Sequence, residues 1–240
     1  REAETEFLAA RATAHQLGGK YAEAAKGYDD ALRAAEGYGL EDHAARISIE
    51  RGRLELALGR IPESLEWTLR GHARYARMGD RFGMSNALSS LANIHGRDNS
   101  TPAELEKAVG YHNRSLELAQ PDGGRSDRAI DHFNLGTVHL RLKNYELSRT
   151  YLQKAMALFR ELEDTVGMAY GYHRLGALEA ELNNPREALA LQDRAFETFS
   201  QADRSLDRVL DGDLEELIHA YLVWKRTGKT AGEAKDDLPE

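Results

Sequence analysis

The sequence repeats itself with a period of 40 residues, and this period constrains the fold more than any other feature. Leu135-Gly136 recurs as Leu175-Gly176, and the positions that follow recur at the same interval. The other matched pairs are Ser148 with Ala188, Ala155 with Ala195, and Phe159 with Phe199. A fixed period of about 20–50 residues is typical of a chain that stacks similar structural units.

Small residues extend the same frame towards the start of the chain. They lie at Ala12, Gly52 and Ala92, each 40 residues apart, and the step from Ala92 to Gly136 is 44 residues. The four extra residues fall in the segment 96–102, whose Gly, Asp, Asn, Ser and Pro residues favour a loop. The frame therefore predicts five repeats, of which the third carries a longer turn.

Each repeat is predicted to be two helices joined by a turn. The small residue of the frame allows the first helix to cross the second closely. Reciprocal small residues on the second helices are Ala24, Ser64, Ala108, Ser148 and Ala188. Apolar residues at helical spacing fill the fourth repeat: Leu135, Leu142, Leu147, Leu152, Met156 and Phe159. The predicted helix pairs are 2–17 with 21–36, 41–58 with 62–78, 81–95 with 102–119, 125–142 with 145–162, and 165–182 with 185–202.

This arrangement resembles the tetratricopeptide repeat, whose pattern joins Leu-Gly, small residues and aromatics in a helical hairpin. The junction 78–84 also resembles the junction 162–168. Such junctions resemble the 40-residue class found in Leu-Gly-Asn-repeat adaptors, kinesin light chains and bacterial regulators. The resemblance covers about residues 3–225. It implies an all-α, right-handed superhelix of about five helix pairs that binds protein or peptide in its concave groove.

The expected organisation is a solenoid over residues 1–226 followed by a tail or linker over 227–240. The repeats are expected at about 5–38, 45–78, 85–119, 129–162 and 169–202, with a capping helix at 205–226. Consecutive Leu222, Val223 and Trp224 cannot all face the last repeat, so this helix is a candidate surface for a homodimer or an attached output domain. Because the chain starts at Arg1, we interpret it as a piece of a longer protein.

Composition excludes several classes of function. The 240 residues carry a formal net charge of −8, which argues against a nucleic-acid partner. The absence of cysteine excludes disulfides and thiol catalysis and suits a cytoplasmic protein. There is no apolar run near 18 residues, so no membrane partner is expected.

Histidine recurs at one repeat position, as His15, His95, His139 and His219. Equivalent positions on successive repeats are separated by about 10 Å, whereas two ligands of one zinc ion lie within about 4 Å. We therefore interpret these side chains as half-buried fillers of an aromatic position and expect no metal and no other cofactor. The sequence contains no Gly-x-Ser-x-Gly motif, and no paired carboxylates in a recognisable context, so no enzyme is expected.

The resemblance implies that the first helices of all repeats line the groove. Their expected exposed positions carry Arg, Asn and aromatic residues where solvated helices usually carry Lys and Glu. These are Arg46, Ile49, Arg53, Asn86, Ser89, Asn93, Phe133, Asn134, Thr137, Tyr170, His173, Arg174 and Ala177. Asn can pair with both sides of a peptide group, and Arg can clamp a carboxylate. The alternative is a generic polar surface.

Part of the carboxylate clamp of chaperone-binding tetratricopeptide domains is also present. Asn93, Asn134 and Arg174 match three clamp positions, and Ser89 and Tyr170 replace its two lysines. We expect an acidic or C-terminal peptide as the ligand. The predicted function is the sensory or regulatory part of a larger bacterial signalling protein, and the alternative is a stand-alone scaffold or adaptor without a ligand switch.

Overall fold

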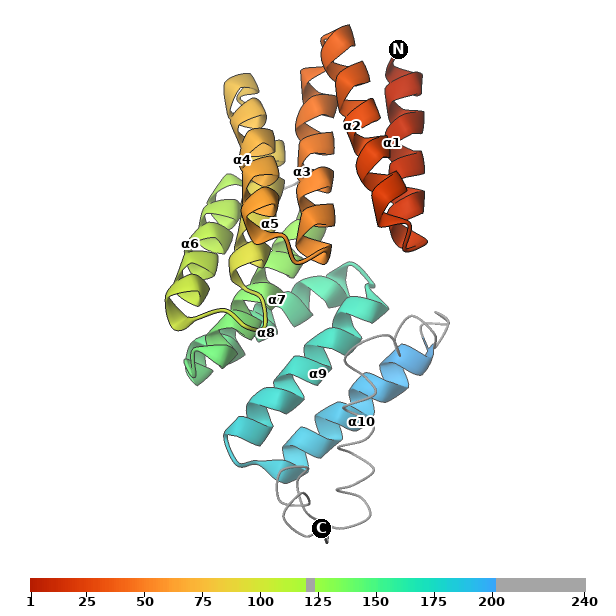
Figure 1. Ribbon diagram of the computed structural model, residues 1–240. Helices are drawn as coiled ribbons and strands as arrows, with labels where there is room; N and C mark the ends of the chain where they lie inside the picture. Colours follow the sequence, from red (N-terminus) through yellow and green to blue (C-terminus); the bar gives the residue numbers. More distant parts are fainter. Residues whose placement is uncertain (120–123, 202–240) are drawn as a thin grey trace, which may run out of the picture. The chain divides into compact units, whose positions relative to one another are not determined.

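The computed structural model describes residues 1–119 and 124–201. These residues form ten α-helices and no strand, which confirms the all-α class (Figure 1). The helices are α1 (Glu2–Leu17), α2 (Tyr21–Tyr38), α3 (Glu41–Ala57), α4 (Ile61–Met78), α5 (Arg81–His95), α6 (Pro102–Leu118), α7 (Arg125–Arg141), α8 (Tyr145–Glu161), α9 (Thr165–Glu181) and α10 (Pro185–Gln201). The predicted boundaries are confirmed, and the largest difference is at the end of α2, expected at 36 and found at 38.

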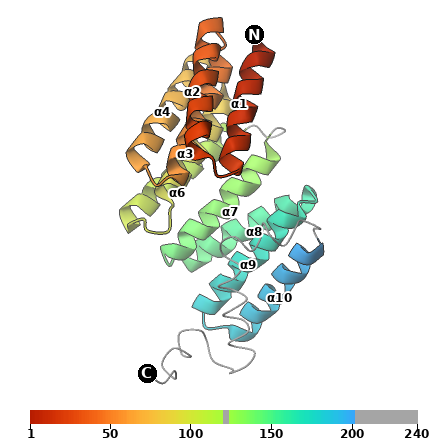
Figure 2. The same cartoon turned by 45° about the vertical axis from the view of Figure 1, so that its right-hand side comes forward.

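The chain divides into two compact units, Arg1–Leu158 and Phe159–Glu240. In the first unit α1 packs against α2, α3 against α4, and α5 against α6, as antiparallel hairpins. In the second unit α9 and α10 form another antiparallel hairpin (Figure 2). The expected capping helix at 205–226 and tail at 227–240 lie outside the described residues.

The small residues of the repeat frame lie at the helix crossings, as predicted. Ala12, Gly52, Ala92, Gly136 and Gly176 are all buried. The reciprocal small residues of the second helices, Ala24, Ser64, Ala108, Ser148 and Ala188, are buried too. Two of these crossings each contain a hydrogen bond between the facing helices. The Ser64 hydroxyl donates to the backbone carbonyl of Gly52, and the Ser148 hydroxyl donates to that of Gly136, both at 2.8 Å.

A left-handed residue follows most of the helices at an interval of 20 residues. Glycine occupies this position at 19, 39, 59 and 79, with φ between 70° and 73°. Lys143, Glu163 and Asn183 occupy it further along, with φ of 60°, 53° and 59°. Glycine adopts this conformation without steric cost, whereas a side chain there is strained. Each helix and its turn thus take 20 residues, and two such units give the 40-residue period.

The two matching junctions have the same local structure. The Asp80 side chain accepts a hydrogen bond from the Gly83 backbone N–H at 3.0 Å, and Asp164 accepts one from Gly167 at 2.9 Å. Each aspartate therefore caps the start of its helix, α5 or α9. A side chain on Gly83 would collide with the ring of Tyr75, and one on Gly167 with the ring of Phe159.

The longer turn of the third repeat is held by the next repeat. The Arg141 guanidinium donates to the backbone carbonyls of Gly96, Arg97 and Asp98 at 2.6, 2.7 and 2.8 Å. Thr101 then starts α6 with a capping box that it forms with Glu104. The four additional residues thus sit in a loop fixed to the first helix of the following repeat.

The prediction that Leu147 belongs to the core is wrong. It was expected to fill the fourth repeat, but it is 48% exposed. The buried positions of α8 follow one stripe, which consists of Ser148, Leu152, Ala155, Met156 and Phe159. Leu147 precedes this stripe by one residue, which turns its side chain by about 100° away from the core.

Candidate functional site

The first helices of the hairpins in the first unit, α1, α3, α5 and α7, contact one another across repeats. α1 packs against α3, and α3 packs against α5. The candidate residues Arg46 and Arg53 lie on α3, Asn86 and Asn93 on α5, and Phe133 and Asn134 on α7. These residues of α3, α5 and α7, together with Glu6 of α1, form a surface that we call the inner face.

The two arginines of the inner face are each paired with a carboxylate. Arg46 of α3 donates to Glu6 of α1 at 2.7 Å, and Arg53 donates to Glu50 at 2.8 Å. Arg53 also donates to the hydroxyl of Ser90 on α5 at 3.2 Å. The arginine side chains are 43% and 49% exposed, so both pairs are in contact with water. Each arginine of the inner face therefore lies beside a carboxylate.

Asparagines follow on α5 and α7. The Asn134 side-chain nitrogen donates to the Asn93 side-chain oxygen at 3.2 Å, and this bond joins α5 to α7. Asn86 lies seven residues before Asn93, two helical turns away on the same side of α5. Asn93 is exposed, and Asn86 and Asn134 are half-buried. The structure thus brings these three predicted residues onto neighbouring helices, with the half-buried Phe133 beside Asn134 in sequence.

Ile49 and Ser89 do not behave as exposed groove positions. Ile49 is 4% exposed and packs where Gly71 of α4 lacks a side chain, so the expectation that it lines the groove is wrong. Ser89 is half-buried, and its hydroxyl donates inwards to the Asp131 carboxylate at 2.7 Å. Its polar group therefore serves the packing of α5 against α7.

Asp131 is the centre of a buried polar network that the sequence did not reveal. Besides Ser89, its carboxylate is bonded to His112 Nδ1 at 2.7 Å and accepts from the Ser115 hydroxyl at 2.6 Å. Ser85 bonds to Ser115 in turn, at 2.8 Å. The side chains of His112 and Asp131 are each 1% exposed. The network joins α5, α6 and α7, and the buried position of its titratable groups leaves them out of reach of a ligand.

The remaining candidates lie in the second unit, on α9. Tyr170 is 43% exposed and meets the ring of Phe199 edge-on, with 5.0 Å between the ring centroids. His173 Nδ1 lies 3.2 Å from Gln192 Oε1, and Arg174 is half-buried. Because these residues belong to the second unit, the predicted row of Asn93, Asn134 and Arg174 stays a prediction.

Two of the repeated histidines, His95 and His139, pack against aromatic rings, and His219 lies outside the described residues. His95 stacks on Tyr111 at 5.7 Å, and His139 stacks on Tyr151 at 5.4 Å between ring centroids. Burial lowers the pKa of both imidazoles below its usual value. Within residues 1–119 and 124–201, no group of three or more metal-ligating side chains is found. None of the helices in those same ranges has the length and apolar composition to cross a membrane.

Residues 126–201 match the family model of the tetratricopeptide repeat. Over these residues the chain carries tetratricopeptide repeats. This confirms the family that the 40-residue frame indicated. Proteins of this family bind protein or peptide partners and are generally non-enzymatic. No curated protein matches the chain in sequence.

Solved structures with tetratricopeptide-type repeats share the fold. The apo quorum sensor NprR from B. thuringiensis is 13% identical with a TM-score of 0.73, and the match covers 97% of this chain and 62% of NprR. BtubC (BKLC) from P. vanneervenii is 21% identical with a TM-score of 0.70, over 82% and 80% of the two chains. A putative kinesin light chain repeat protein from Podosopora anserina is 13% identical with a TM-score of 0.64, over 84% and 97%.

Proposed function

We propose that the inner face of the first unit binds an extended segment of a protein partner. The observation that carries this proposal is the group of asparagines, in which Asn134 is bonded to Asn93 and Asn86 lies on the same side of α5. In the bond between Asn93 and Asn134, the side-chain nitrogen of Asn134 donates to the side-chain oxygen of Asn93. The other groups, the Asn93 nitrogen and the Asn134 oxygen, are a donor and an acceptor that match the two sides of a peptide unit.

We also propose that Arg46 and Arg53 are the contacts for a carboxylate of an acidic or C-terminal segment. A ligand carboxylate would replace Glu6 at Arg46, or Glu50 at Arg53. Such exposed pairs contribute only about 0–1 kcal/mol each, so the exchange costs little. Arginine then holds the new carboxylate through two parallel hydrogen bonds. In the second unit, considered by itself, we propose Arg174 and Tyr170 as ligand contacts.

We further propose that the protein is the sensory or regulatory part of a bacterial signalling protein and acts in the cytoplasm. This proposal is supported by the fold that it shares with NprR, which is a quorum sensor. An output domain or a second copy would then pack on residues 205–226. The competing function, a scaffold without a ligand switch, is favoured by the bonds Glu6–Arg46 and Asn93–Asn134, because they join successive repeats.

The test starts with selection of binding peptides from a displayed random library, followed by anisotropy titration of a labelled selected peptide. The double variant Asn93→Ala/Asn134→Ala should bind it about 1–3 kcal/mol more weakly, since each lost hydrogen bond contributes about 0.5–1.5 kcal/mol. The matched control is Asn99→Ala/Asn113→Ala, which removes two asparagines away from the inner face. Equal affinity of the two double variants would place the binding site elsewhere.

A further inference from the structure

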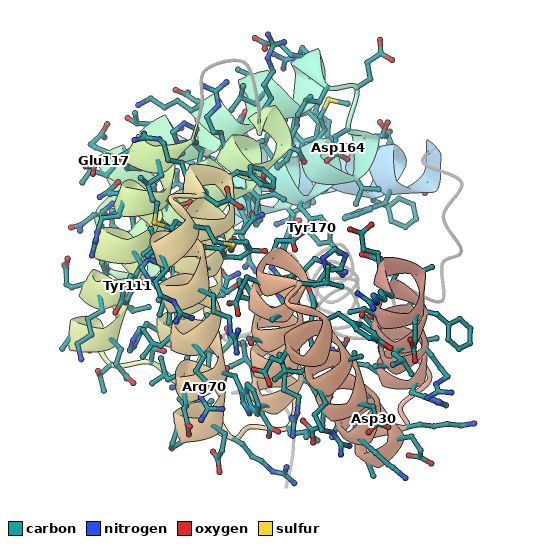
Figure 3. The ribbon with its side chains drawn as sticks, turned by 90° about the horizontal axis from the view of Figure 1, so that it is seen from above. Asp30, Arg70, Tyr111, Glu117, Asp164 and Tyr170 are labelled. Atoms are coloured by element: carbon teal, nitrogen blue, oxygen red, sulfur yellow. The ribbon has the colours of Figure 1, made fainter. Side chains whose placement is uncertain are left out.

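Helix α1 exposes a face that the other first helices of the first unit bury. In the repeat frame, Phe7 is equivalent to Ile47 of α3, Ala87 of α5 and Asp131 of α7. These three residues are at most 1% exposed, because α2, α4 and α6 pack on the helices that carry them, whereas Phe7 is 64% exposed. Two views show α1 at the edge of the first unit, beside α2 with its labelled Asp30 (Figure 1 and Figure 3). This face of α1 therefore corresponds to a helix-packing surface of the later repeats.

A second position of α1 shows the same difference. Ala14 is exposed, whereas its equivalents Leu54, Ile94 and Val138 are at most 4% exposed. Four exposed residues of α1 follow the spacing i, i+3, i+7 and i+10, which keeps their side chains on one side of the helix. We call these four residues the outer stripe: Glu4, Phe7, Arg11 and Ala14.

The outer stripe carries one positive and one negative side chain. The Arg11 guanidinium lies over the Phe7 ring, 5.8 Å from its centroid, and forms no ion pair within residues 1–119 and 124–201. Glu4 accepts a hydrogen bond from the Tyr38 hydroxyl at 2.7 Å through one of its two carboxylate oxygens. Seven residues of helix separate the two charges by about 10 Å, at 1.5 Å per residue, so they do not pair with each other in one copy of α1.

The second repeat shows how this face pairs its arginine. Arg51 of α3 is equivalent to Arg11, and its Nε donates to the Asp29 carboxylate of α2 at 3.2 Å. A short turn joins α2 to α3, so the two helices run antiparallel. A helix that packs antiparallel on the outer stripe and carries a carboxylate at the matching place would therefore pair with Arg11.

α1 itself is such a helix. When two outer stripes overlap fully in antiparallel orientation, Arg11 of one copy lies level with Phe7 of the other. Glu4 of that other copy is one helical turn further, about 4.5 Å along the axis. An arginine can lie on an aromatic ring and hold a carboxylate with its N–H edge, so Arg11 suits both neighbours. In parallel orientation, Arg11 would instead face Arg11, and Glu4 would face Glu4.

We propose that the outer stripe joins two copies of this chain in a two-fold symmetric dimer, with α1 of each copy packed antiparallel on the other. The interface is isologous, so each contact occurs twice. It covers one face of a 16-residue helix, about 24 Å long, which gives a small interface, below about 1,200 Å² in total, and a reversible dimer. Glu6 of the inner face and residues 205–226 are not part of the outer stripe.

Sedimentation equilibrium of the whole chain, from about 10 µM to about 1 mM, measures this association. Salt at about 0.15 M screens the repulsion between two chains of net charge −8. We expect the average mass to rise from 26.8 kDa towards twice that value and no further, because a two-fold interface closes on itself. A constant mass of one chain, or a mass that rises beyond two chains, would overturn the proposal.

Charge reversals test the contact itself. Arg11→Glu and Glu4→Arg each place like charges opposite each other, so either variant alone should associate at least about tenfold more weakly than the parent. An equimolar mixture of the two variants should form a mixed dimer, because each Glu then faces an Arg of the other variant. The matched control, Arg114→Glu, makes the same change of charge at an exposed position of α6 and should dimerise as the parent does. Unchanged association of Arg11→Glu, or no association in the mixture, would show that the contact lies elsewhere.

This dimer does not depend on the proposed peptide site. Both reversed side chains are exposed, and circular dichroism checks that the variants keep their helices. The inner-face variant Asn93→Ala/Asn134→Ala should dimerise as the parent does. Loss of the dimer in that variant would move the contact from the outer stripe to the inner face.

Discussion

Replacing Gly136 with alanine adds one methyl group where α7 crosses α8, and the structure gives the space for it. The new Cβ would lie 2.6 Å from Leu152 Cγ, 2.8 Å from its Cδ2 and 3.1 Å from its backbone nitrogen. Leu152 is fully buried, so it cannot move aside without a shift of α8. Gly110, in the middle of α6, has no atom within 4 Å of the same position and serves as the matched control.

The two substitutions should change stability in opposite directions. Alanine inside a helix is favoured over glycine by about 0.5–1 kcal/mol, so Gly110→Ala should stabilise the protein by that amount. Gly136→Ala gains the same term but also overpacks the crossing, which costs about 1–3 kcal/mol. The difference between the variants therefore isolates the overpacking cost of about 1–3 kcal/mol. Gly136→Leu should cost more than Gly136→Ala.

Thermal unfolding followed by far-ultraviolet circular dichroism measures this difference. For a chain of this size, 1 kcal/mol shifts the Tm by about 2–4 °C, so Gly136→Ala should melt about 2–12 °C below Gly110→Ala. Equal Tm values for the two variants would show that the crossing is not tightly packed. The repeat frame, which places Gly136 there, would then be wrong.

Three further predictions address other parts of the first unit. Asp131→Ala should cost about 3–5 kcal/mol of unfolding free energy in urea titrations, because its buried partners lose their common acceptor, whereas the half-buried Asp127→Ala should change it by less than about 1 kcal/mol. Lys143→Gly should raise the urea midpoint, because it removes the strain of a side chain at φ 60°. Burial lowers the pKa of His132 and His139 below the ordinary value of 6.5. The unfolded chain therefore binds more protons than the folded protein, and the free energy of unfolding should fall as the pH drops below about 6.5. Replacing both histidines with Phe should make this fall smaller.

The parts of the fold that the sequence predicted depend on neighbouring residues in the chain. Helix boundaries follow from periodicity and caps, and the crossing positions follow from small residues in a fixed frame. The sequence therefore places Gly136 and Gly176 correctly at buried positions. The same logic failed for Leu147, because one residue along a helix separates a buried side chain from an exposed one.

The contacts that fill the inner face could not be predicted in the same way. Asp131 takes its partners from α5 and α6, up to 42 residues away in sequence. Ser89 looked like a polar groove position, and only the packing of α5 against α7 shows that its hydroxyl points inwards. Ile49 is buried because α4 presents Gly71 to it, and nothing in the sequence near Ile49 indicates this neighbour. The ion pair of Asp29 with Arg51, between α2 and α3, is equally non-local.

Ligand binding on the inner face would change the bonds that join successive repeats. The bonds Glu6–Arg46 and Asn93–Asn134 join successive repeats. The proposed peptide would replace Glu6 at Arg46, and it would bind the Asn93 nitrogen and the Asn134 oxygen, which the bond between these two residues does not use. Both changes alter the free energy that holds neighbouring repeats together. By linkage, any factor that changes the packing of the repeats changes the affinity for the peptide by the same free energy. The buried network around Asp131 does not take part in this exchange, because its groups are out of reach of a ligand. Binding would therefore act on the exposed bonds between repeats while α5, α6 and α7 stay joined.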